Sequence, residues 1–377
     1  MISSGSAESI SGVYEKSQFK MYDVAIIGAG PAGATLARLI AGTYRALLVD
    51  KRQLTKSTES NSSRKCCGGL LAPDAQGMLS KMRLGLPKSV LVDPQLFVVR
   101  AIDMQQKIER YYQRYYINMD RQKFDCWLLS MVPSSVDIRL DCRFKFYESD
   151  DNGFKITFTQ DNKTYVERAR ILVGADGASS RVRKQVAPDL PFPRTYFAIQ
   201  EWVEAEGQLP YFSTIFDPEI TDYYSWTIPK ENRLVIGAAL YPRQQVLNRF
   251  ELLKKKLRNY GFKFGKTVRK ESAFMFRPVS TKQICTGIER IALLGEAAGW
   301  ISPSSADGLS YAFNSALTLA QVLHKTPEDI TKRFHYQTRK LKRKIFSKNI
   351  KSHFIYHPWM RKIVMRLAIK SMEVYES

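Results

Sequence analysis

Four short apolar runs stand out along the chain, and a glycine or an aspartate follows each of them directly. They cover residues 24–27, 46–49, 171–173 and 291–294. Uninterrupted runs of three or four apolar residues are typical of strands that are buried on both faces of a parallel sheet. Residues 31–42 lie between the first two runs and have helical spacing, so the pattern predicts a βαβ opening and an α/β fold of the Rossmann type.

A second pattern, in which polar residues alternate with apolar or aromatic ones, occurs between these runs. Residues 97–117 predict half-buried antiparallel strands, and residues 144–168 predict a hairpin with an Asp-Asn-Gly turn at residues 151–153. Residues 195–276 are rich in β-forming and aromatic segments, whereas residues 123–131 predict a helix. The sequence therefore predicts a nucleotide-binding layer that is interrupted by an antiparallel β-sheet domain.

The charge of the chain is concentrated near its C-terminal end. The 377 residues include 58 Lys and Arg against 36 Asp and Glu, which gives a net charge of +22. Because 44% of the residues are hydrophobic, the chain is no disordered polycation, and the excess charge indicates an anionic partner. Residues 332–370 contain 13 Lys and Arg and no acid, interleaved with aromatic and aliphatic residues. We predict a basic C-terminal helical tail there, broken near His357-Pro358.

Three explanations fit this tail: an interfacial helix on a membrane, a phosphate-binding and base-stacking surface, or a solvated helical face. We expect contact with an anionic membrane through residues 332–370 and no nucleic-acid partner, because no nucleic-acid-binding motif accompanies the tail. The chain has no run of roughly 18 apolar residues for a spanning helix, and residues 1–20 lack the apolar core of a signal peptide. We interpret residues 1–20 as a disordered leader or tag, and we expect a cytoplasmic protein, peripheral at the inner face of the membrane.

The cysteines argue against a disulfide framework and against a structural metal site. There are five of them, at irregular spacing and without a C-x-x-C pair, and the chain has four histidines. An intracellular chain of this kind is expected to keep reduced thiols and to hold no structural zinc.

A glycine-rich turn, Gly-Ala-Gly-Pro-Ala-Gly at residues 28–33, follows the first apolar run. Gly28 permits a tight turn, Gly30 lets a pyrophosphate approach the backbone, and Gly33 lets helix and strand pack closely. Asp50 ends the second run 22 residues after Gly28, where an acid can bind a ribose. A plain glycine turn and a solvated acid are the alternatives. The next residue, Lys51, is either solvated or lies along the nucleotide.

Two further glycine-acid turns follow the third and fourth apolar runs. They are Gly-Ala-Asp-Gly at residues 174–177 and Gly-Glu-Ala-Ala-Gly at residues 295–299. Each turn taken by itself is equally well explained as the end of a strand. All three glycine turns, however, lie where a doubly wound sheet binds its ligand, at the carboxyl ends of parallel strands.

With Arg121-x-x-Phe124-Asp125, these turns resemble the FAD-dependent oxidoreductases of the p-hydroxybenzoate hydroxylase fold. Lys-Cys-Cys-Gly-Gly at residues 65–69 resembles the K-x-C-G-G motif of the geranylgeranyl reductase family, and residues 224–230 resemble its Y-x-W-x-F-P-K strand. The resemblance covers about residues 22–366. It implies FAD-binding segments at residues 21–69, 121–190 and 277–325 and substrate-domain segments at residues 70–120 and 191–276. The charge pattern of the tail predicts basic helices at residues 326–377.

The resemblance also implies which residues bind FAD. They are Gly28, Gly30, Pro31, Ala32, Gly33, Asp50, Lys51, Lys65, Gly68, Gly69, Arg121, Asp176, Gly177, Gly295, Glu296, Gly308 and Leu309. Arg121 would reach the adenosine side, with an ion pair to Asp125 on an exposed helix as the alternative. Glu296 stands where the wider family usually has Asp, so its contact with the cofactor is either displaced or indirect.

Residues 303–309, Pro-Ser-Ser-Ala-Asp-Gly-Leu, correspond to the family loop that opens a helix beside the isoalloxazine. Backbone N–H groups and the positive end of the helix dipole would stabilise negative charge on the reduced flavin there. An ordinary N-cap by Ser304 or Ser305 is an explanation compatible with this one. Ala306 replaces a family glycine, which predicts a tighter loop.

Cys67 falls on the family cysteine near the flavin and is the candidate catalytic residue, as a proton donor or as part of the pocket wall. Structural packing is the alternative. With its neighbour Cys66 we expect two thiols, because a vicinal disulfide would be strained. Tyr224 and Trp226 face the same side of one strand and form either a core stripe or the wall of an apolar substrate pocket.

We therefore expect an FAD-dependent oxidoreductase that reduces C=C bonds of a polyprenyl or other apolar lipid-like substrate by hydride transfer from flavin N5. No second G-x-G-x-x-G motif exists, so the reductant is either NAD(P)H in the same cleft or a redox protein. A flavin monooxygenase or halogenase is the alternative, because residues 226–229 match the end of the halogenase W-x-W-x-I-P motif. Outside the enzymes, a membrane- or nucleic-acid-binding protein with a vestigial flavin fold is the alternative.

Overall fold

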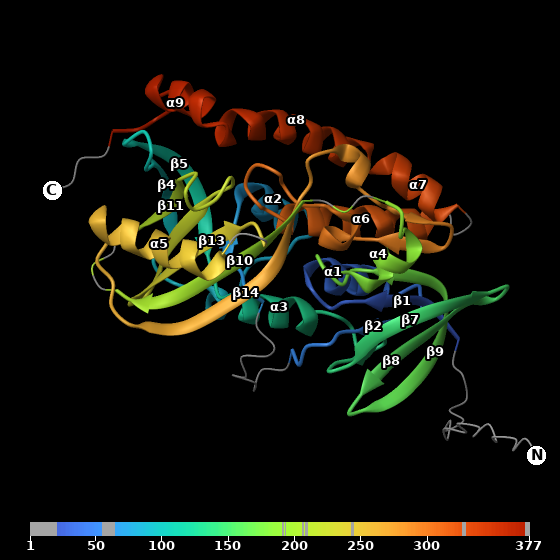
Figure 1. Ribbon diagram of the computed structural model, residues 1–377. Coiled ribbons are helices and arrows are strands. Elements are labelled where there is room, and N and C mark those ends of the chain that lie inside the picture. The colour runs from blue at the N-terminus through green and yellow to red at the C-terminus, as the bar shows by residue number, and fades with distance from the viewer. Residues whose placement is uncertain are drawn as a thin grey trace, which may run out of the picture.

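The structure is a computed structural model of two β-sheets with helices packed on both (Figure 1). It describes residues 21–54, 65–190, 194–205, 210–242, 245–325 and 329–373, together with residues 192 and 207. The predicted leader, residues 1–20, lies outside the described residues.

The first sheet contains all four apolar runs of the sequence. Its strands are β1 (Met21–Ile27), β2 (Ala46–Val49), β6 (Asp137–Arg139), β7 (Arg143–Asp150), β8 (Gly153–Gln160), β9 (Lys163–Gly174), β15 (Gly287–Ile288) and β16 (Ile291–Leu293). The order is β15-β16-β9-β1-β2-β6, in which β16, β9, β1, β2 and β6 run parallel and the hairpin β7–β8 pairs with β9. The predicted α/β layer of the Rossmann type is confirmed.

Alternate residues of β1 supply two hydrophobic cores, one on each face of this sheet. Val24 and Ile26 pack with three helices. These are α1 (Pro31–Ile40), α3 (Arg121–Ser130) and α6 (Leu309–Lys325). Ala25 and Ile27 pack on the other face, with the hairpin β7–β8. Because both faces of β1 are buried, its central residues are apolar without alternation.

The second sheet interrupts the first one twice along the chain. Its strands are β3 (Leu70–Leu71), β4 (Leu96–Asp103), β5 (Ile108–Asn118), β10 (Arg194–Glu204), β11 (Tyr211–Phe216), β12 (Ser225–Lys230), β13 (Arg233–Leu240) and β14 (Thr267–Arg277). The order is β14-β10-β13-β12-β11-β4-β5-β3, and β11 with β4 is a parallel pair among antiparallel ones. The predicted interruption is thus confirmed, while the exact domain boundaries stay a prediction.

Several helices are not among the predicted elements. They are α2 (Pro73–Lys81), α4 (Arg181–Val186), α5 (Val246–Asn259) and the short 3₁₀ helices η2 (Lys88–Val90), η3 (Thr281–Gln283) and η4 (Gly295–Ala298). Helix α5 lies inside the segment that the aromatic content marks as β-rich. Its buried residues Phe250, Leu253 and Leu257 have helical spacing and pack against the second sheet, so the periodicity gave a signal for this helix.

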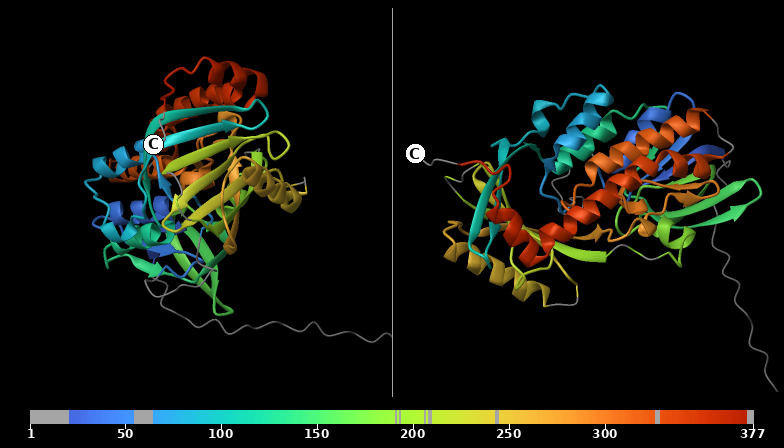
Figure 2. Two further views of the ribbon diagram at one scale, coloured as in Figure 1. Left: turned by 90° about the vertical axis from the view of Figure 1, so that its left-hand side faces the viewer. Right: turned by 90° about the horizontal axis from the view of Figure 1, so that it is seen from above.

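The tail is helical, as its pattern predicts, and it has a further break at Thr338, so that it forms three helices. They are α7 (Ile330–Gln337), α8 (Arg339–Tyr356) and α9 (Pro358–Arg366). The break at residues 357–358 is confirmed, with Pro358 in the first turn of α9. The tail runs along both sheets (Figure 2): Ile345 joins a core of the first sheet and Met365 a cluster on the second. No helix among the described residues is long and apolar enough to cross a membrane.

Candidate functional site

The turn after β1 requires glycine at two positions for steric reasons. Gly28 has φ +108°, and a Cβ atom on it would lie 2.4 Å from the carbonyl oxygen of Ala175. A Cβ atom on Gly33 would lie 1.8 Å from the carbonyl oxygen of Gly28. These two glycines therefore let α1 and the turn after β9 pack closely against the end of β1.

Gly30 differs from its neighbours because its missing side chain leaves the N-terminus of α1 open. It is the N-cap of α1 without a side-chain hydrogen bond, and Pro31 follows in the first turn. Beyond the chain neighbours, the described atom nearest to a Cβ on Gly30 would be Arg52 Nη2, at 3.8 Å. An open helix N-terminus attracts phosphate. Residues 28–33, including Ala32, therefore fit the pyrophosphate of FAD.

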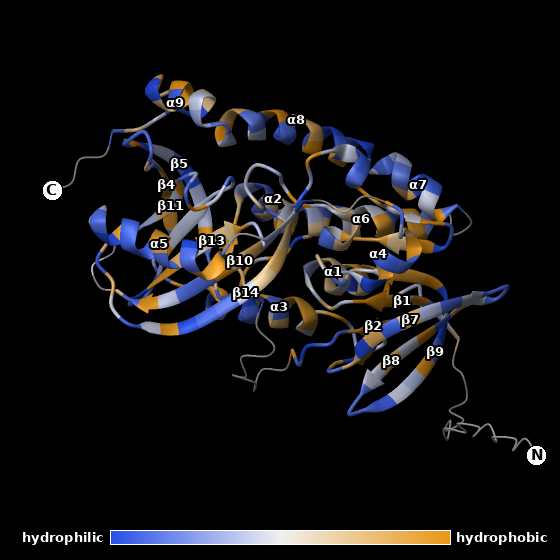
Figure 3. Cartoon of the chain, viewed as in Figure 1, coloured by the Kyte–Doolittle hydropathy of each residue, from blue (hydrophilic) through white to orange (hydrophobic). Residues whose placement is uncertain are grey.

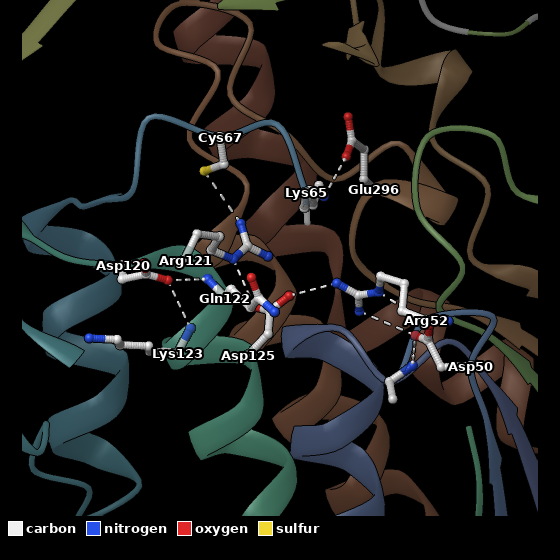
Figure 4. Close-up of polar contacts among 11 residues, drawn as sticks. Asp50, Arg52, Lys65, Cys67, Asp120, Arg121, Gln122, Lys123, Asp125 and Glu296 are labelled. Atoms are coloured by element: carbon white, nitrogen blue, oxygen red, sulfur yellow. Dashed lines mark hydrogen bonds and ion pairs between the residues drawn. The ribbon is translucent and has the colours of Figure 1, made fainter. Parts of the chain in front are cut away.

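A chain of four alternating charges joins the end of β2 to α3 (Figure 4). Arg52 lies between two acids, with Nε 3.1 Å from Asp50 Oδ1 and Nη1 2.9 Å from Asp125 Oδ2. Arg121 Nε donates to the other oxygen of Asp125 at 2.7 Å. Burial acts to raise the pKa of Asp125, but the two guanidinium groups outweigh it and hold that pKa below its usual value.

The expected pairing of Arg121 with Asp125 is thus confirmed, but the expected exposed helix face is wrong. The side chains of Arg121 and Asp125 are 9% and 1% exposed. The ion pair is buried because Arg52, from another element, shares the same carboxylate. The role of Arg121 toward the adenosine of FAD stays a prediction.

Asp50, the predicted ribose ligand, already accepts four hydrogen bonds from the protein. Its Oδ1 accepts from Arg52 N at 2.8 Å and Nε at 3.1 Å, and its Oδ2 from Ala29 N at 2.6 Å and Arg52 Nη2 at 3.2 Å. A carboxylate offers about four lone-pair positions, so a ribose hydroxyl must displace or share one of these donors. Lys51 is exposed beside it, and its contact with the cofactor stays a prediction.

Cys67 Sγ lies at the end of the charge chain (Figure 4). Arg121 Nη1 and the backbone N–H of Gly69 each approach it to 3.5 Å. Cys66 points instead toward the carbonyl oxygen of Ala198, and burial raises the pKa of its thiol. Both cysteines are free thiols. Cys67 is the one that faces the candidate site.

Lys230 ends the aromatic motif on β12 and has no predicted role. Its Nζ donates to Asn118 Oδ1 at 2.6 Å and to the carbonyl oxygen of Met119 at 2.9 Å. Burial lowers the pKa of Lys230 to about 8. Lys230, Cys67 and Arg121 line the same small hollow. The sequence could not indicate a role for Lys230, because its partner Asn118 lies on a different strand, 112 residues away along the chain.

The two glycines after Cys67 pack against the second sheet at this point. A Cβ atom on Gly68 would lie 2.5 Å from Ile228 Cδ1, and one on Gly69 would lie 2.2 Å from the carbonyl oxygen of Met119. These contacts give both glycines a packing role, beside the cofactor contact that the resemblance implies.

We expect Lys230→Met to remove a contribution to stability that increases with pH between pH 8 and pH 10. The folded pKa of Lys230 is about 8, whereas an unfolded lysine titrates near 10.4. In this interval the unfolded state therefore binds more protons, and the free energy of unfolding increases with pH, by about 2 kcal/mol. Urea unfolding at both pH values measures the difference, and exposed Lys255→Met is the control. Equal pH dependence in all three proteins would contradict the prediction.

The second glycine-acid turn is tied to the helix that follows it. Asp176 Oδ2 accepts from the N–H of Arg181, the first residue of α4, at 2.8 Å. Its Oδ1 is buried without a partner among the described residues, and burial raises the pKa of Asp176. Gly177 has φ +78° and open space around it. An unpartnered carboxylate oxygen beside an open backbone is compatible with the predicted cofactor contact.

The third turn connects the two sheets. Gly295 donates to Ser315 Oγ at 3.1 Å. Glu296 Oε1 accepts from the N–H of Phe276 at 3.2 Å, and its Oε2 lies 3.6 Å from Lys65 Nζ (Figure 4). The Glu296 carboxylate is thus engaged by the end of β14 and by the Cys67 segment. Of the two expectations for Glu296, these contacts favour an indirect role at the cofactor.

Helix α6 begins at Leu309, after a loop that ends at Gly308. Asp307 Oδ1 accepts from the N–H of Leu309 at 3.1 Å, and Asp307 Oδ2 accepts from Ser310 Oγ at 2.7 Å. The expected N-cap by Ser304 or Ser305 is therefore wrong. The two serine hydroxyls bond to Ser302 instead, because the loop turns once more before the helix starts.

We expect Ala306→Gly to raise the free energy of unfolding by about 0.5–1 kcal/mol. Ala306 has φ +51°, a left-handed conformation in which its Cβ is crowded and glycine is not. The expected increase in the free energy of unfolding is smaller than the conformational strain that is removed, because glycine also increases the entropy of the unfolded chain. Urea unfolding measures it, and Ala320→Gly inside α6 is the control, with an expected loss of stability. A loss in both variants would contradict the strain.

Tyr224 and Trp226 belong to a buried aromatic cluster where the second sheet meets the loop before α6. Tyr224 OH donates to the carbonyl oxygen of Ser305 at 3.2 Å. Its ring centroid lies 4.8 Å from that of Tyr223 and 6.4 Å from that of Tyr356 in α8. The two residues therefore pack in the core, which fits both alternatives, and the cluster includes the tail.

The side chain of Trp226 also has a buried N–H group without a hydrogen-bond partner among the described residues. A Cβ atom on Gly237, its partner on β13, would lie 2.2 Å from Trp226 Cε2, so this glycine makes room for the indole. Buried polar groups are nearly always satisfied, so this N–H fits a polar atom of a bound molecule.

Sequence comparison identifies relatives over almost the whole chain. The model of the FAD binding domain family matches residues 21–255. Protein CbrA of Escherichia coli O157:H7 is 43% identical over 345 residues, which are 92% of this chain and 96% of CbrA.

Two solved structures have the same fold. The geranylgeranyl bacteriochlorophyll reductase-like protein of Thermoplasma acidophilum matches with a TM-score of 0.79 and 18% identity, over 94% of this chain and 92% of its own. PqsL of Pseudomonas aeruginosa, a probable FAD-dependent monooxygenase, matches with a TM-score of 0.67 and 17% identity, over 93% and 100%. The predicted p-hydroxybenzoate hydroxylase-like fold is confirmed.

Proposed function

The chain belongs to the FAD binding domain family and to the CbrA proteins, and from this premise we propose that it is an FAD-dependent reductase of C=C bonds. Its substrate in this proposal is a polyprenyl or other apolar, lipid-like molecule. The observation that carries the proposal is the aromatic cluster of Tyr224 and Trp226. The cluster is buried and aromatic, and its Tyr224 donates a hydrogen bond to the loop before α6.

The position of this cluster supports an apolar substrate. The resemblance puts the loop before α6 beside the isoalloxazine, and Tyr224 contacts that loop at Ser305. Binding sites for apolar molecules are lined by aromatic and aliphatic side chains with a few polar groups. The unpartnered indole N–H of Trp226 supplies such a polar group.

Bound and reduced FAD would supply the hydride for this reaction. The chain holds the pyrophosphate at Gly30 and the N-terminus of α1, where the backbone is open. In this proposal Cys67 Sγ donates the proton that completes the reduction of the C=C bond. Arg121 Nη1 and the N–H of Gly69, each 3.5 Å from the sulfur, stabilise the thiolate that remains. Cys67 is therefore our candidate catalytic residue.

In this proposal the electrons come from a separate reductant that the chain binds. No second G-x-G-x-x-G motif occurs in the sequence. We propose that the reductant is either NAD(P)H bound transiently in the same cleft or another redox protein.

A flavin monooxygenase or halogenase is the second candidate. The likeness to PqsL, with its TM-score of 0.67, supports monooxygenation. Residues 226–229 support halogenation, although Tyr224 stands in place of the first tryptophan of the motif. The fold is common to all of these reactions, so the choice depends on the chemistry at the site.

Anaerobic flavin reoxidation separates the candidates. The purified protein is reduced without oxygen and mixed with a detergent-solubilised polyprenyl alkene while the flavin absorbance is followed. Reoxidation by the alkene in the absence of oxygen supports the reductase. Reoxidation only in the presence of oxygen, with formation of a hydroxylated or halogenated product, supports the monooxygenase or halogenase and overturns our proposal.

We also propose that the protein is cytoplasmic and peripheral at the inner face of the membrane, where a polyprenyl substrate resides. The basic tail supports this proposal through its charge, since residues 332–370 contain no acid. Lys and Arg near an anionic leaflet each contribute about 1 kcal/mol of attraction.

A further inference from the structure

The helices α8 and α9 divide into an inner and an outer face. On α8, Leu341, Ile345 and Ser352 are buried, and on α9 Arg361 and Met365 are buried. Their positions follow helical spacing, so they share the side that packs on the protein. The inner face therefore belongs to the core. One of the tail's charges, that of Arg361, is buried there as well.

The outer face is both apolar and basic. Its large exposed side chains are Phe346 (60% exposed), Ile350 (47%), Phe354 (48%), Trp359 (64%), Ile363 (40%) and Leu367 (64%). On α8, Arg339, Arg343 and Phe346 follow one another at spacings of four and three residues, so they share one side of the helix. On α9, Arg366 lies three residues after Ile363 and therefore on the same side as Ile363. Figure 3 shows hydrophobic and hydrophilic segments alternating along both helices. We call these nine residues the outer face.

The inner face of α8 touches the candidate site directly. Ser352 Oγ donates to the carbonyl oxygen of Pro303 at 3.2 Å, and Tyr356 OH donates to that of Ser304 at 2.9 Å. Arg277 Cζ lies 4.4 Å from the ring centroids of both Tyr223 and Tyr356, which are themselves 4.7 Å apart. A single helix thus has the loop before α6 on one side and the outer face on the other.

The end of the tail is fixed to the second sheet by a buried ion pair. Arg361 Nε donates to Asp103 Oδ2 at 2.7 Å, and both side chains are buried. Arg110 Nε donates to the carbonyl oxygen of Met365 at 2.7 Å. The outer face is therefore held in a fixed orientation relative to the aromatic cluster.

We propose that the outer face docks the protein on an anionic lipid bilayer, with the loop before α6 and the aromatic cluster held directly beneath it. This inference rests on the proposed lipid-like substrate and names the surface through which that substrate would be reached. Three arginines match an anionic headgroup layer, and the apolar side chains match the acyl boundary below it. Ile350, Ile363 and Leu367 have no ring on which a base could stack, so a bilayer fits better than a nucleic acid.

The test uses the full chain, because truncation before α7 would remove Tyr356 and Arg361 from the core. The docking variant combines Phe346→Ser, Phe354→Ser and Trp359→Ser. The matched control combines Phe97→Ser, Leu247→Ser and Phe274→Ser, which are also exposed but lie away from the tail. Flotation is measured with phosphatidylcholine vesicles, with and without phosphatidylglycerol.

We expect the unmodified protein and the control to float with the anionic vesicles, and the docking variant to bind them at least tenfold more weakly. Replacing Arg339, Arg343 and Arg366 together by Gln should weaken binding to a similar extent. Equal flotation of the docking variant and the control would overturn the proposal. Preferential binding of the unmodified protein to duplex DNA or RNA over anionic vesicles would overturn it in favour of a nucleic acid.

A second readout separates this inference from the proposed function. Anaerobic flavin reoxidation by a detergent-solubilised alkene does not require a bilayer, so the docking variant should retain it. If the unmodified protein shows reoxidation but no flotation, the docking surface is refuted and the reductase stands. If it floats but shows no reoxidation, the premise of a lipid-like substrate fails, and with it the role that we give to docking.

Discussion

Asp125→Asn should lower the free energy of unfolding by about 3–5 kcal/mol. Asp125 is 1% exposed and neutralises two guanidinium groups, that of Arg121 (9% exposed) and that of Arg52 (15% exposed). The amide of Asn has nearly the same size but no charge, so Arg121 would lose its carboxylate partner and Arg52 would keep only Asp50. Urea unfolding near neutral pH measures the loss.

A matched exposed residue gives the control for this substitution. Asp329 pairs with Lys332 at 3.6 Å on the surface, and Asp329→Asn should change stability by about 0.5 kcal/mol or less. The depressed pKa of Asp125 gives a second check. Its contribution is present above the unfolded pKa of about 3.9 and is lost as the pH falls through the lower folded pKa. A loss at Asp125 as small as at Asp329 would show that the charge chain does not hold these elements together.

Gly30→Ala should weaken FAD binding by about 100-fold, which corresponds to about 2.7 kcal/mol, without unfolding the protein. The φ of Gly30 is −71°, which alanine adopts without strain, and the added Cβ would meet Arg52 Nη2 no closer than 3.8 Å. The same methyl group would occupy the space through which a pyrophosphate approaches the backbone. Titration of the apoprotein with FAD, followed by flavin fluorescence, measures the affinity.

Alanine substitutions at two other glycines are the controls for Gly30→Ala. Gly42→Ala places its Cβ in open space and should change neither affinity nor folding. Gly33→Ala puts its Cβ 1.8 Å from a carbonyl oxygen and should destabilise the fold itself. Unchanged FAD affinity in Gly30→Ala would place the cofactor elsewhere, whereas an unfolded apoprotein would mean that Gly30 has a packing role.

Local pattern was sufficient to predict the cofactor-binding half of the fold. The apolar runs and the turns after them depend on neighbouring residues, since burial on both faces selects apolar runs and steric crowding selects Gly28 and Gly33. The helix break at Pro358 is local for the same reason, because proline starts a helix more readily than it continues one. These predictions are confirmed.

Contacts between distant segments could not be predicted in this way. Arg52 and Asp125 are 73 residues apart in the chain, and Arg361 and Asp103 are 258 apart. No periodicity joins such positions, so nothing in the sequence marks Arg52 as the centre of an ion-pair network. The same limit explains why Lys230 had no predicted role.

The tail shows a second limit of the sequence. Hydrophobic spacing predicts its helices, but apolar residues lie on both of their faces, and adjacent positions differ. Ile345 is fully buried and Phe346 is 60% exposed. Which apolar residue packs inward depends on the surface that the helix meets, here the first sheet, the loop before α6 and the second sheet.

The mass of the product from a single anaerobic turnover tests the reductase proposal most directly. Enzyme with reduced FAD is mixed with one equivalent of a polyprenyl alkene in the absence of oxygen, and the extracted lipid is analysed by mass spectrometry. We predict a product that is heavier than the substrate by two hydrogen atoms, formed in proportion to the flavin that is reoxidised. Unchanged substrate without oxygen, together with a product heavier by one oxygen atom in air, would contradict the reductase and identify a monooxygenase.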